Sequence, residues 1–239
     1  MFVAARRIGS SPCSQTCTPI TLEGVILGID TSIGTAVAVI EPDGVVRAQL
    51  DSGDPRGHAE VIGDHLARAL AEAQISSGEI THVAAGMGPG PFTGLRVGIA
   101  AARTFALGRG IPVVPVVSHD AVALDRLLLA ALTDAGEGRF AVVTDARRRE
   151  FAYTVYEGMD DDGLPVRVTD TALVPRDEID ATLEALGARR LDATVVPAGM
   201  LALAAARAVA AGRRIAGDDA LYLRSPDVSA PTAPKRVGG

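Results

Sequence analysis

The sequence predicts an α/β protein built as two related lobes, and three observations support that prediction. Short apolar stretches of strand length alternate with longer stretches of helical periodicity. A succession of strands followed by helices occurs twice, with the change near Val117. The chain has 239 residues, of which 48% are hydrophobic and 22% charged, so it has an ordinary globular composition and is long enough to bury a large core.

The first lobe is placed at residues 24–117. Apolar or alternating stretches bounded by turn residues predict its strands, and apolar residues at helical spacing predict its helices. The expected elements are strands at Val25–Asp30, Thr35–Ile40 and Val45–Asp51, a helix over Gly57–Ala73, a strand at Val83–Ala85, a helix over Gly94–Gly108 that ends at glycine, and a strand at Val113–Val117.

The second lobe is placed at residues 118–225, and the same signals predict its elements. They are a helix near Asp120–Leu132, strands at Phe140–Asp145, Glu150–Tyr156 and Val166–Leu173, a helix over Arg176–Leu186, a strand at Ala193–Pro197 and an Ala-rich helix over Met200–Ala210.

The two ends of the chain differ in composition from the lobes between them. Residues 1–23 have no apolar period and no apolar stretch of signal-peptide length, so we expect a disordered extension. Residues 226–239 contain two prolines beyond Pro226 and predict a flexible tail. Cys13 and Cys17 have no second cysteine pair or nearby histidine to complete a metal site, which predicts two free thiols in a reducing compartment.

Composition excludes two classes of function for the isolated chain. No apolar run approaches the roughly 18 residues that a membrane-spanning helix needs. The formal net charge is −6 and aromatic residues make up only 3%, whereas proteins that grip nucleic acid usually have a basic surface and stacking rings. The sequence therefore predicts a cytoplasmic protein that has no membrane contact and does not bind RNA strongly by itself.

A polar turn follows the first predicted strand. Asp30 ends that strand, and Thr31, Ser32 and Gly34 lead into the next. Because ligands gather at strand ends in open α/β sheets, this turn is a candidate phosphate or magnesium–phosphate site. The same residues also make a good hairpin turn, in which Asp and Ser bond their own backbone. Both interpretations stay open at this stage.

Glycines alternate with prolines in the loop before the helix predicted at Gly94–Gly108. With Thr93 as the expected N-cap, Gly90, Thr93 and Gly94 would present backbone N–H groups that attract an anion. The spacing matches neither a Walker loop nor a dinucleotide-binding fingerprint. The alternative is a rigid connection between strand and helix.

Several motifs together resemble the TsaB family of tRNA threonylcarbamoyladenosine biosynthesis proteins. They are "ILGIDTSIGTAVAVI", "GHAEVI", "GPGPFTGLRVG", "TDARRREFAYTVY" and "LYLRSPDV", which span Val25 to about Val228. Pro91 stands where the family pattern has serine. The resemblance implies an actin/Hsp70-like ATPase fold in two lobes, with the second lobe reduced.

The resemblance also implies partners and a non-catalytic role. A TsaD-like paralogue would carry ATP and a divalent metal and would modify the adenosine 3′ of the tRNA anticodon, while this chain alone would bind no cofactor. A TsaE-like ATPase would join the complex, and this chain would contact tRNA only within that complex. In isolation, the chain could pair with a second copy of itself.

Two enzymatic alternatives can be weighed on single residues. In a metallopeptidase-like paralogue, two histidines four residues apart on a helix would bind metal, but here His119 is followed at that spacing by Ala123. A stand-alone ATPase or kinase of this fold would have Asp-x-Gly at its first turn, but here the glycine is delayed to Gly34. Neither alternative finds its full pattern.

One helix has an apolar arc wider than a core requires. In Gly57–Ala73, we expect the centre of the arc to face the chain's own sheet and one flank to meet a protein partner. The expected interface residues are His58, Val61 and His65, with Arg96 on the neighbouring helix; the expected core residues are Ile62, Leu66, Ala69 and Ala73. The alternatives are an ordinary helix with histidines at its edge, and a homodimeric structural protein that uses this face on itself.

Arg147, Arg148 and Arg149 form the densest basic run. They are candidates for a phosphate contact to tRNA in the assembled complex. We favour the alternative, a solvated turn whose arginines are paired in part with Asp145 and Glu150.

Overall fold

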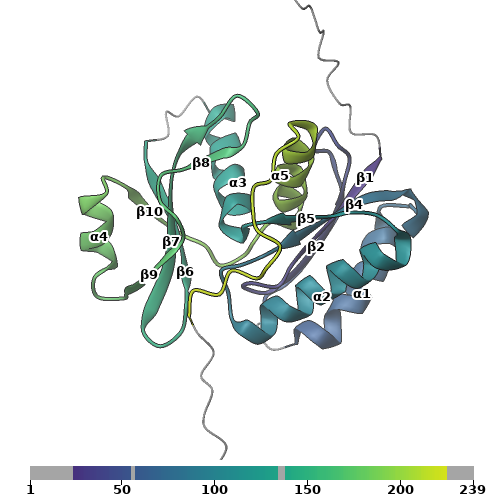
Figure 1. Ribbon diagram of the computed structural model, residues 1–239, viewed down its shortest axis with the longest axis horizontal. Coiled ribbons are helices and arrows are strands. Elements are labelled where there is room, and N and C mark those ends of the chain that lie inside the picture. The colour runs from purple at the N-terminus through teal and green to yellow at the C-terminus, as the bar shows by residue number, and fades with distance from the viewer. Residues whose placement is uncertain (1–23, 55–56, 134–137, 225–239) are drawn as a thin grey trace, which may run out of the picture.

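The computed structural model contains two five-stranded sheets with helices packed on the faces of each (Figure 1). It describes residues 24–54, 57–133 and 138–224. The extension predicted at residues 1–23, with Cys13 and Cys17, and the tail predicted at 226–239 lie outside these ranges. The arrangement confirms the expected α/β fold, since each sheet is followed by helices in the order that the sequence pattern predicts.

The first sheet has the strand order β3-β2-β1-β4-β5. β1 runs antiparallel to β2 and parallel to β4, and all six of its residues are buried because it is central and covered on both faces. The strands are β1 (Val25–Asp30), β2 (Thr35–Ile40), β3 (Val46–Ser52), β4 (Ile80–Gly86) and β5 (Val113–Val116). Helices α1 (His58–Glu72) and α2 (Phe92–Arg109) cover one face, and a short 3-10 turn, η1 (Ser77–Glu79), precedes β4.

The second sheet has the strand order β10-β6-β7-β8, and β9 also pairs with β7. Its strands are β6 (Phe140–Asp145), β7 (Glu150–Met159), β8 (Pro165–Arg167), β9 (Ala172–Pro175) and β10 (Arg189–Asp192). Helix α4 (Ile179–Ala185) packs on one face, where Ile179 and Leu183 join a small apolar cluster with Ala141, Val143, Val155 and Val174.

Helices α3 (Ser118–Leu132) and α5 (Ala198–Ala210) lie between the two sheets and pack against each other. Here the largest apolar core forms, around Phe140, Tyr156, Leu124 and Leu201. α5 approaches β1 so closely that a Cβ on Gly28 would lie 2.4 Å from the carbonyl oxygen of Ala198. The chain then returns to the first sheet, where the N–H of Leu221 donates to the carbonyl of Met87 at 2.7 Å.

Four predicted elements need correction. The stretch Val166–Leu173 is not one strand: between β8 and β9 the hydroxyl of Thr169 accepts the N–H of Val155, which interrupts the backbone ladder along β7. The strand expected at Ala193–Pro197 is instead β10, four residues earlier, because a charged segment with an exposed face suffices at a sheet edge.

The other two corrections concern helix starts. α2 begins at Phe92 with Pro91 as its N-cap, so Thr93 is not the cap. α4 begins only at Ile179, after a turn. In addition, Leu66 is partly rather than fully buried on α1.

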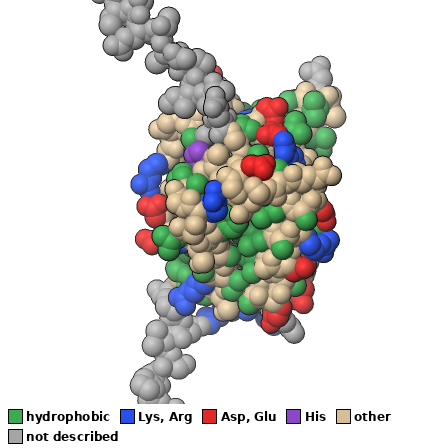
Figure 2. All heavy atoms as spheres, turned by 90° about the vertical axis from the view of Figure 1, so that its right-hand side faces the viewer, with side chains coloured by type: hydrophobic (Ala, Val, Ile, Leu, Met, Phe, Trp, Pro, Cys, Tyr) green, Lys and Arg blue, Asp and Glu red, His purple; other side chains and the backbone are tan. Residues whose placement is uncertain are grey.

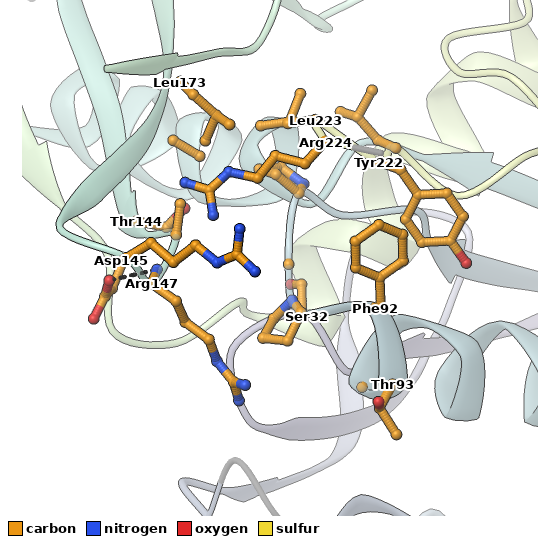
Figure 3. Close-up of a pocket in the computed structure, with 18 of the residues that line it drawn as sticks. Ser32, Phe92, Thr93, Thr144, Asp145, Arg147, Leu173, Tyr222, Leu223 and Arg224 are labelled. Atoms are coloured by element: carbon orange, nitrogen blue, oxygen red, sulfur yellow. Dashed lines mark hydrogen bonds between the residues drawn. The ribbon is translucent and has the colours of Figure 1, made fainter. Parts of the chain in front are cut away.

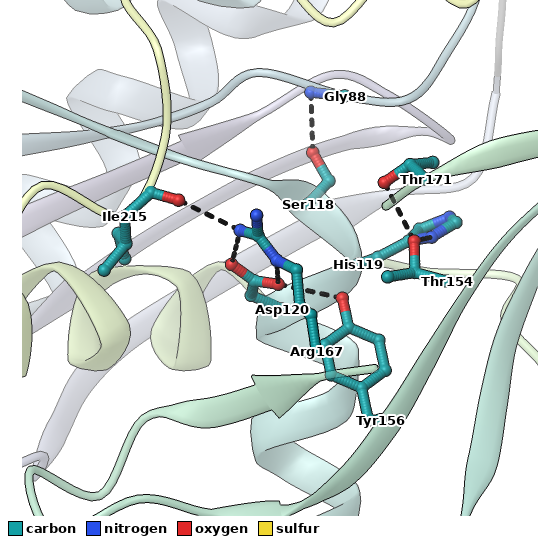
Figure 4. Close-up of polar contacts among 9 residues, drawn as sticks. All are labelled: Gly88, Ser118, His119, Asp120, Thr154, Tyr156, Arg167, Thr171 and Ile215. Atoms are coloured by element: carbon teal, nitrogen blue, oxygen red, sulfur yellow. Dashed lines mark hydrogen bonds and ion pairs between the residues drawn. The ribbon is translucent and has the colours of Figure 1, made fainter. Parts of the chain in front are cut away.

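A buried polar network joins α3 to β7, β8 and the returning C-terminal segment (Figure 4). Asp120 accepts two hydrogen bonds from Arg167, one of them at 2.7 Å from Nε, and a third at 2.8 Å from the hydroxyl of Tyr156. Arg167 also donates to the carbonyl of Ile215 at 3.0 Å. Burial, and then the neighbouring Asp120 charge, raise the pKa of Tyr156, so its hydroxyl remains a donor. The network therefore ties α3 and the returning C-terminal segment to the second sheet.

We predict that Arg167→Leu will destabilise the chain by about 3–5 kcal/mol, because the Asp120 carboxylate would remain buried without its charged partner. Chemical denaturation would measure the loss. Adding Asp120→Asn to the same variant should recover part of it, since a neutral amide needs no counter-ion. Equal stability of the single and double variants would contradict the assignment of this pair as a buried charge–charge contact.

Candidate functional site

Four segments far apart in the sequence meet around a cleft of about 490 Å³, which we call the central cleft (Figure 3). They are the turn after β1, the Gly-Pro loop before α2, the turn between β6 and β7, and the segment 221–224. The lining includes Ser32, His58, Pro89, Gly90, Pro91, Phe92, Thr93, Gly94, Thr144, Asp145, Arg147, Arg148, Leu173 and Tyr222, Leu223 and Arg224. The structure therefore joins the three motifs that the sequence singled out separately.

Asp30 itself does not line the cleft. Its side chain is buried, with 1% of the residue exposed, and accepts the backbone N–H of Ser32 at 2.8 Å and the Ser32 hydroxyl at 2.5 Å. Its other oxygen accepts the hydroxyl of Ser118 at the start of α3. Burial raises the pKa of this carboxyl, against the opposing effect of these hydrogen bonds. Of the two interpretations of the turn, this geometry is that of the structural hairpin.

Thr31 points away from the cleft and into α2. Its hydroxyl donates to the carbonyl of Gly94 at 2.7 Å and accepts the N–H of Gly98 at 3.0 Å. A Cβ on Gly98 would lie 2.2 Å from that hydroxyl oxygen, so only glycine permits the contact. Thr31 thus fixes α2 against the turn, while Ser32, Gly90, Thr93 and Gly94 remain at the cleft wall.

The N-terminus of α2 opens onto the cleft. No side chain caps it, and the first hydrogen bond inside the helix is from the N–H of Leu95 to Pro91. The ring of Phe92 stacks on that of Tyr222 with 4.4 Å between centroids. Arg96 donates to the Tyr222 hydroxyl at 3.0 Å. The returning segment, to which no role could be given from sequence, therefore forms part of this wall.

The β6–β7 turn forms the opposite wall and has an unusual backbone. Arg147, Arg148 and Arg149 have φ values of 62°, 51° and 63°, a left-handed conformation that costs roughly 1–2 kcal/mol for each residue with a Cβ. Partial burial raises the pKa of Asp145, but hydrogen bonds from Arg176 at 2.6 Å and from the Arg147 N–H outweigh it and hold that pKa below its usual range. Arg224 pairs with Glu150 beside the same turn.

His119 has both ring nitrogens engaged in the core. Nδ1 lies 2.8 Å from the hydroxyl of Thr154, and Nε2 lies 3.0 Å from that of Thr144 (Figure 4). Burial, with a smaller contribution from the Arg167 charge, lowers the pKa of His119 to about 3. Both nitrogens that could have bound a metal are therefore engaged by threonine hydroxyls. Among the described residues, no three His, Cys, Asp or Glu side chains are grouped as a metal site would need.

Comparison with solved structures shows that the fold of the chain is similar to that of YeaZ. A Pseudomonas aeruginosa protein described as similar to peptidase YeaZ aligns over 84% of this chain and 100% of its own length, with a TM-score of 0.65 and 26% identity. YeaZ from the same organism aligns over 79% and 94%, with a TM-score of 0.63 and 25% identity. The chain is a YeaZ-like (TsaB-like) protein.

Sequence comparison agrees with that relationship. Residues 54–170 match the family model described as TsaD, tRNA N6-adenosine threonylcarbamoyltransferase. An uncharacterized Mycobacterium tuberculosis protein is 39% identical over 133 residues, which are 55% of this chain and 58% of the relative. A tRNA N6-adenosine threonylcarbamoyltransferase of Streptococcus pneumoniae is 34% identical over 145 residues, 51% of this chain and 43% of its own. The matched segments of these curated relatives cover 58% of the Mycobacterium tuberculosis protein, 43% of the Streptococcus pneumoniae transferase and 35% of a Mycobacterium leprae relative, so the chain spans well under two thirds of each.

The expected interface residues of the YeaZ-like chain occupy different environments. His58 and His65 are buried, with 6% and 8% exposed, whereas from the sequence we expect them on a flank that meets a partner, with half-exposed edge residues as the alternative. Nδ1 of His58 lies 2.8 Å from the Thr35 hydroxyl, whereas Nδ1 of His65 has no protein partner. Val61 is half-buried. Arg96 is exposed, but the chain's own Tyr222 engages it.

We predict that His119 makes the YeaZ-like chain less stable in acid. A histidine in the unfolded chain has a pKa of about 6.5, so below this pH His119 is protonated in the unfolded chain but stays neutral in the folded chain. Stability from this group is full above pH 6.5 and falls by about 1.4 kcal/mol per pH unit down to about pH 3. Urea unfolding of wild type and His119→Gln at several pH values would measure the difference.

Above neutral pH the two unfolding free energies should keep a constant difference, and below pH 6 the difference should shrink. His82→Gln is the comparison variant: burial also lowers the pKa of His82, but this side chain is only partly buried, so its pH effect should be smaller. Parallel pH dependence of wild type and His119→Gln would contradict a neutral, buried imidazole at this position.

Proposed function

We propose that this chain is a non-catalytic subunit of the machinery that makes threonylcarbamoyladenosine in tRNA, and that it docks on a TsaD-like catalytic paralogue. The observation that carries the proposal is the likeness to YeaZ over most of the chain together with the TsaD family match. In this proposal the partner carries ATP and the divalent metal. A TsaE-like ATPase joins the complex, and tRNA is met only within it.

The interior chemistry supports a non-catalytic role. A magnesium–phosphate group would need the Asp30 carboxylate, but Ser32 and Ser118 occupy both of its oxygens. A metallopeptidase would need His119, whose two nitrogens face threonines. The central cleft favours a second candidate, a stand-alone ATPase or kinase of the same fold, which predicts ATP turnover by the chain alone.

The proposed docking surface is the outer face of α1 and α2, which lie side by side on the first sheet (Figure 1). On the side of the molecule that carries these helices, hydrophobic side chains gather in the middle and charged ones lie around them (Figure 2). On α2, Ala100 is exposed and Leu107 is 84% exposed. Small and apolar exposed residues let another helix approach closely. None of the described helices is long and apolar enough to cross a membrane.

We predict that Ala100→Glu and Val61→Glu will each weaken binding to the TsaD-like paralogue by roughly a hundredfold, because docking would desolvate a charge without a counter-ion. Ala185→Glu is the matched control, since Ala185 is also an exposed helical alanine but lies on α4 at the second sheet. A pull-down with parallel melting curves would separate binding from folding.

Ile62→Glu shows what an unfolded variant looks like in the melting curves. Ile62 belongs to the core beneath α1, so a glutamate there would bury a charge and should unfold the chain. The docking assignment fails if Ala100→Glu stays folded and binds the paralogue as well as Ala185→Glu does. Binding of the second copy of this chain, rather than the paralogue, through the same face would instead favour the homodimer.

A further inference from the structure

Strand β3 has an unpaired outer edge. It lies at one end of the first sheet, and among the described strands only β2 pairs with it. An edge strand presents a row of backbone N–H and C=O groups with which another chain can pair. Because β3 is seven residues long and contains no proline, its whole length can offer these groups.

The two ends of this edge differ in shape. Val45, just before β3, is 57% exposed, and Val46, its first residue, is 42% exposed. At the other end, Gly53 follows the last residue of β3, and a Cβ added to Gly53 would meet no atom of the described residues within 4 Å beyond its chain neighbours. The edge therefore has apolar side chains in water at its start and open space at its end.

Charges of opposite sign lie symmetrically about the middle of β3. The central residue is Gln49, with Arg47 two residues before it and Asp51 two residues after it, and all three are exposed. Arg47 forms an ion pair with Glu41, and Asp51 accepts a hydrogen bond from a neutral group, the Gln49 side-chain amide, at 3.2 Å. Arg47 is the extra residue of a bulge, so no residue of β2 lies opposite it. Its long side chain can therefore turn toward a carboxylate beyond the edge.

We propose that two copies of this chain pair through the outer edges of β3, antiparallel and centred on Gln49. A twofold axis at Gln49 brings each Arg47 opposite Asp51 of the other copy, so both of these cross-strand contacts are attractive. The same register sets Val45 opposite Gly53, where the valine side chain meets open space. Gln49 faces its own copy, and because it is neutral it does not repel itself there. The backbone bonds across the axis join the first sheets of the two copies into one continuous sheet.

This contact goes beyond the proposed docking role and uses a different part of the chain. Helices α1 and α5 pack on the two faces of the sheet at β3, so the edge of the strand is what remains for a second copy. Helix α2, which carries Ala100 of the proposed docking surface, packs on β4 and β1 instead. A contact made by a single strand is small, so we expect weak pairing that rises with protein concentration.

Sedimentation velocity of the full chain over a concentration series measures this self-association. Asp51→Arg sets arginine against arginine in both cross-strand contacts and should weaken self-association at least about tenfold. Arg47→Asp sets aspartate against aspartate and should weaken it to a similar extent. Glu184→Arg is the matched control, because it makes the same change of charge at an exposed position of α4. Melting curves of all three variants show whether each is folded.

A mixture of the two edge variants tests the register itself. Asp51→Arg carries arginine at both positions and Arg47→Asp carries aspartate at both, so each repels its own copy and attracts the other variant. An equal mixture should therefore associate about as strongly as wild type, although neither variant does so alone. A mixture that stays monomeric would overturn the proposal, as would equal self-association of Asp51→Arg and Glu184→Arg.

Hydrogen exchange of the wild-type chain locates the contact. The outward N–H groups of β3 should exchange more slowly as the protein concentration rises, because pairing gives them acceptors. Slow exchange of these groups in the dilute monomer would show that another segment of the chain already covers the edge, which would overturn the proposal. So would a wild-type chain that stays monomeric at millimolar concentration, or self-association that Ala100→Glu abolishes and Asp51→Arg does not.

The same variants keep this inference separate from the proposed function. Asp51→Arg changes the edge of β3 and leaves α2 intact, so it should still capture the TsaD-like paralogue. Ala100→Glu should show the reverse, with self-association retained and docking weakened. A failure of the wild-type chain to dock on the paralogue would leave the self-association result unaffected.

Discussion

The close approach of the turn after β1 to β4 and α2 determines the rest of the site. Four glycines spaced four residues apart make it possible, since a Cβ on Gly86, Gly90, Gly94 or Gly98 would lie between 1.8 and 2.9 Å from an atom of residues 30–32. Because these positions carry no side chain, Thr31 can bridge to α2 and Asp30 can be buried against Ser118. The N-terminus of α2 is thereby fixed at the central cleft.

Much of the fold follows from local sequence signals, and its errors have local causes. Continuous apolar runs predict β1 and β2 because central strands are buried on both faces. The charged strand β10 escapes prediction, since an edge strand needs no apolar alternation, and the break between β8 and β9 depends on a threonine hydroxyl that replaces a backbone acceptor. The placement of α5 on the first sheet depends on contacts between distant residues, which periodicity does not encode.

The site was predictable as separate motifs but not as one arrangement. Glycine spacing and the strand-end position identify the Ser32 turn and the Gly90–Gly94 loop, and the basic run identifies the β6–β7 turn. That all three line one cleft depends on how the two sheets pack. Ser118 lies in none of the singled-out motifs, although its hydroxyl donates to Asp30. Tyr222 lies in a motif of the family resemblance, but its stacking on Phe92 at the cleft depends on the return of the chain to the first sheet. The burial of His58 and His65 likewise depends on packing beneath α1 and α2.

A non-catalytic subunit is defined by what fails when it is left out, so reconstitution tests the proposed function most directly. The chain, the TsaD-like paralogue, the TsaE-like ATPase, tRNA, ATP and an activated threonylcarbamoyl donor would be combined, and incorporation into tRNA measured with each component omitted. The account predicts no incorporation by this chain without the paralogue, and a large loss when this chain alone is omitted. Modification of tRNA by this chain without the paralogue, or full activity of the paralogue without this chain, would contradict it.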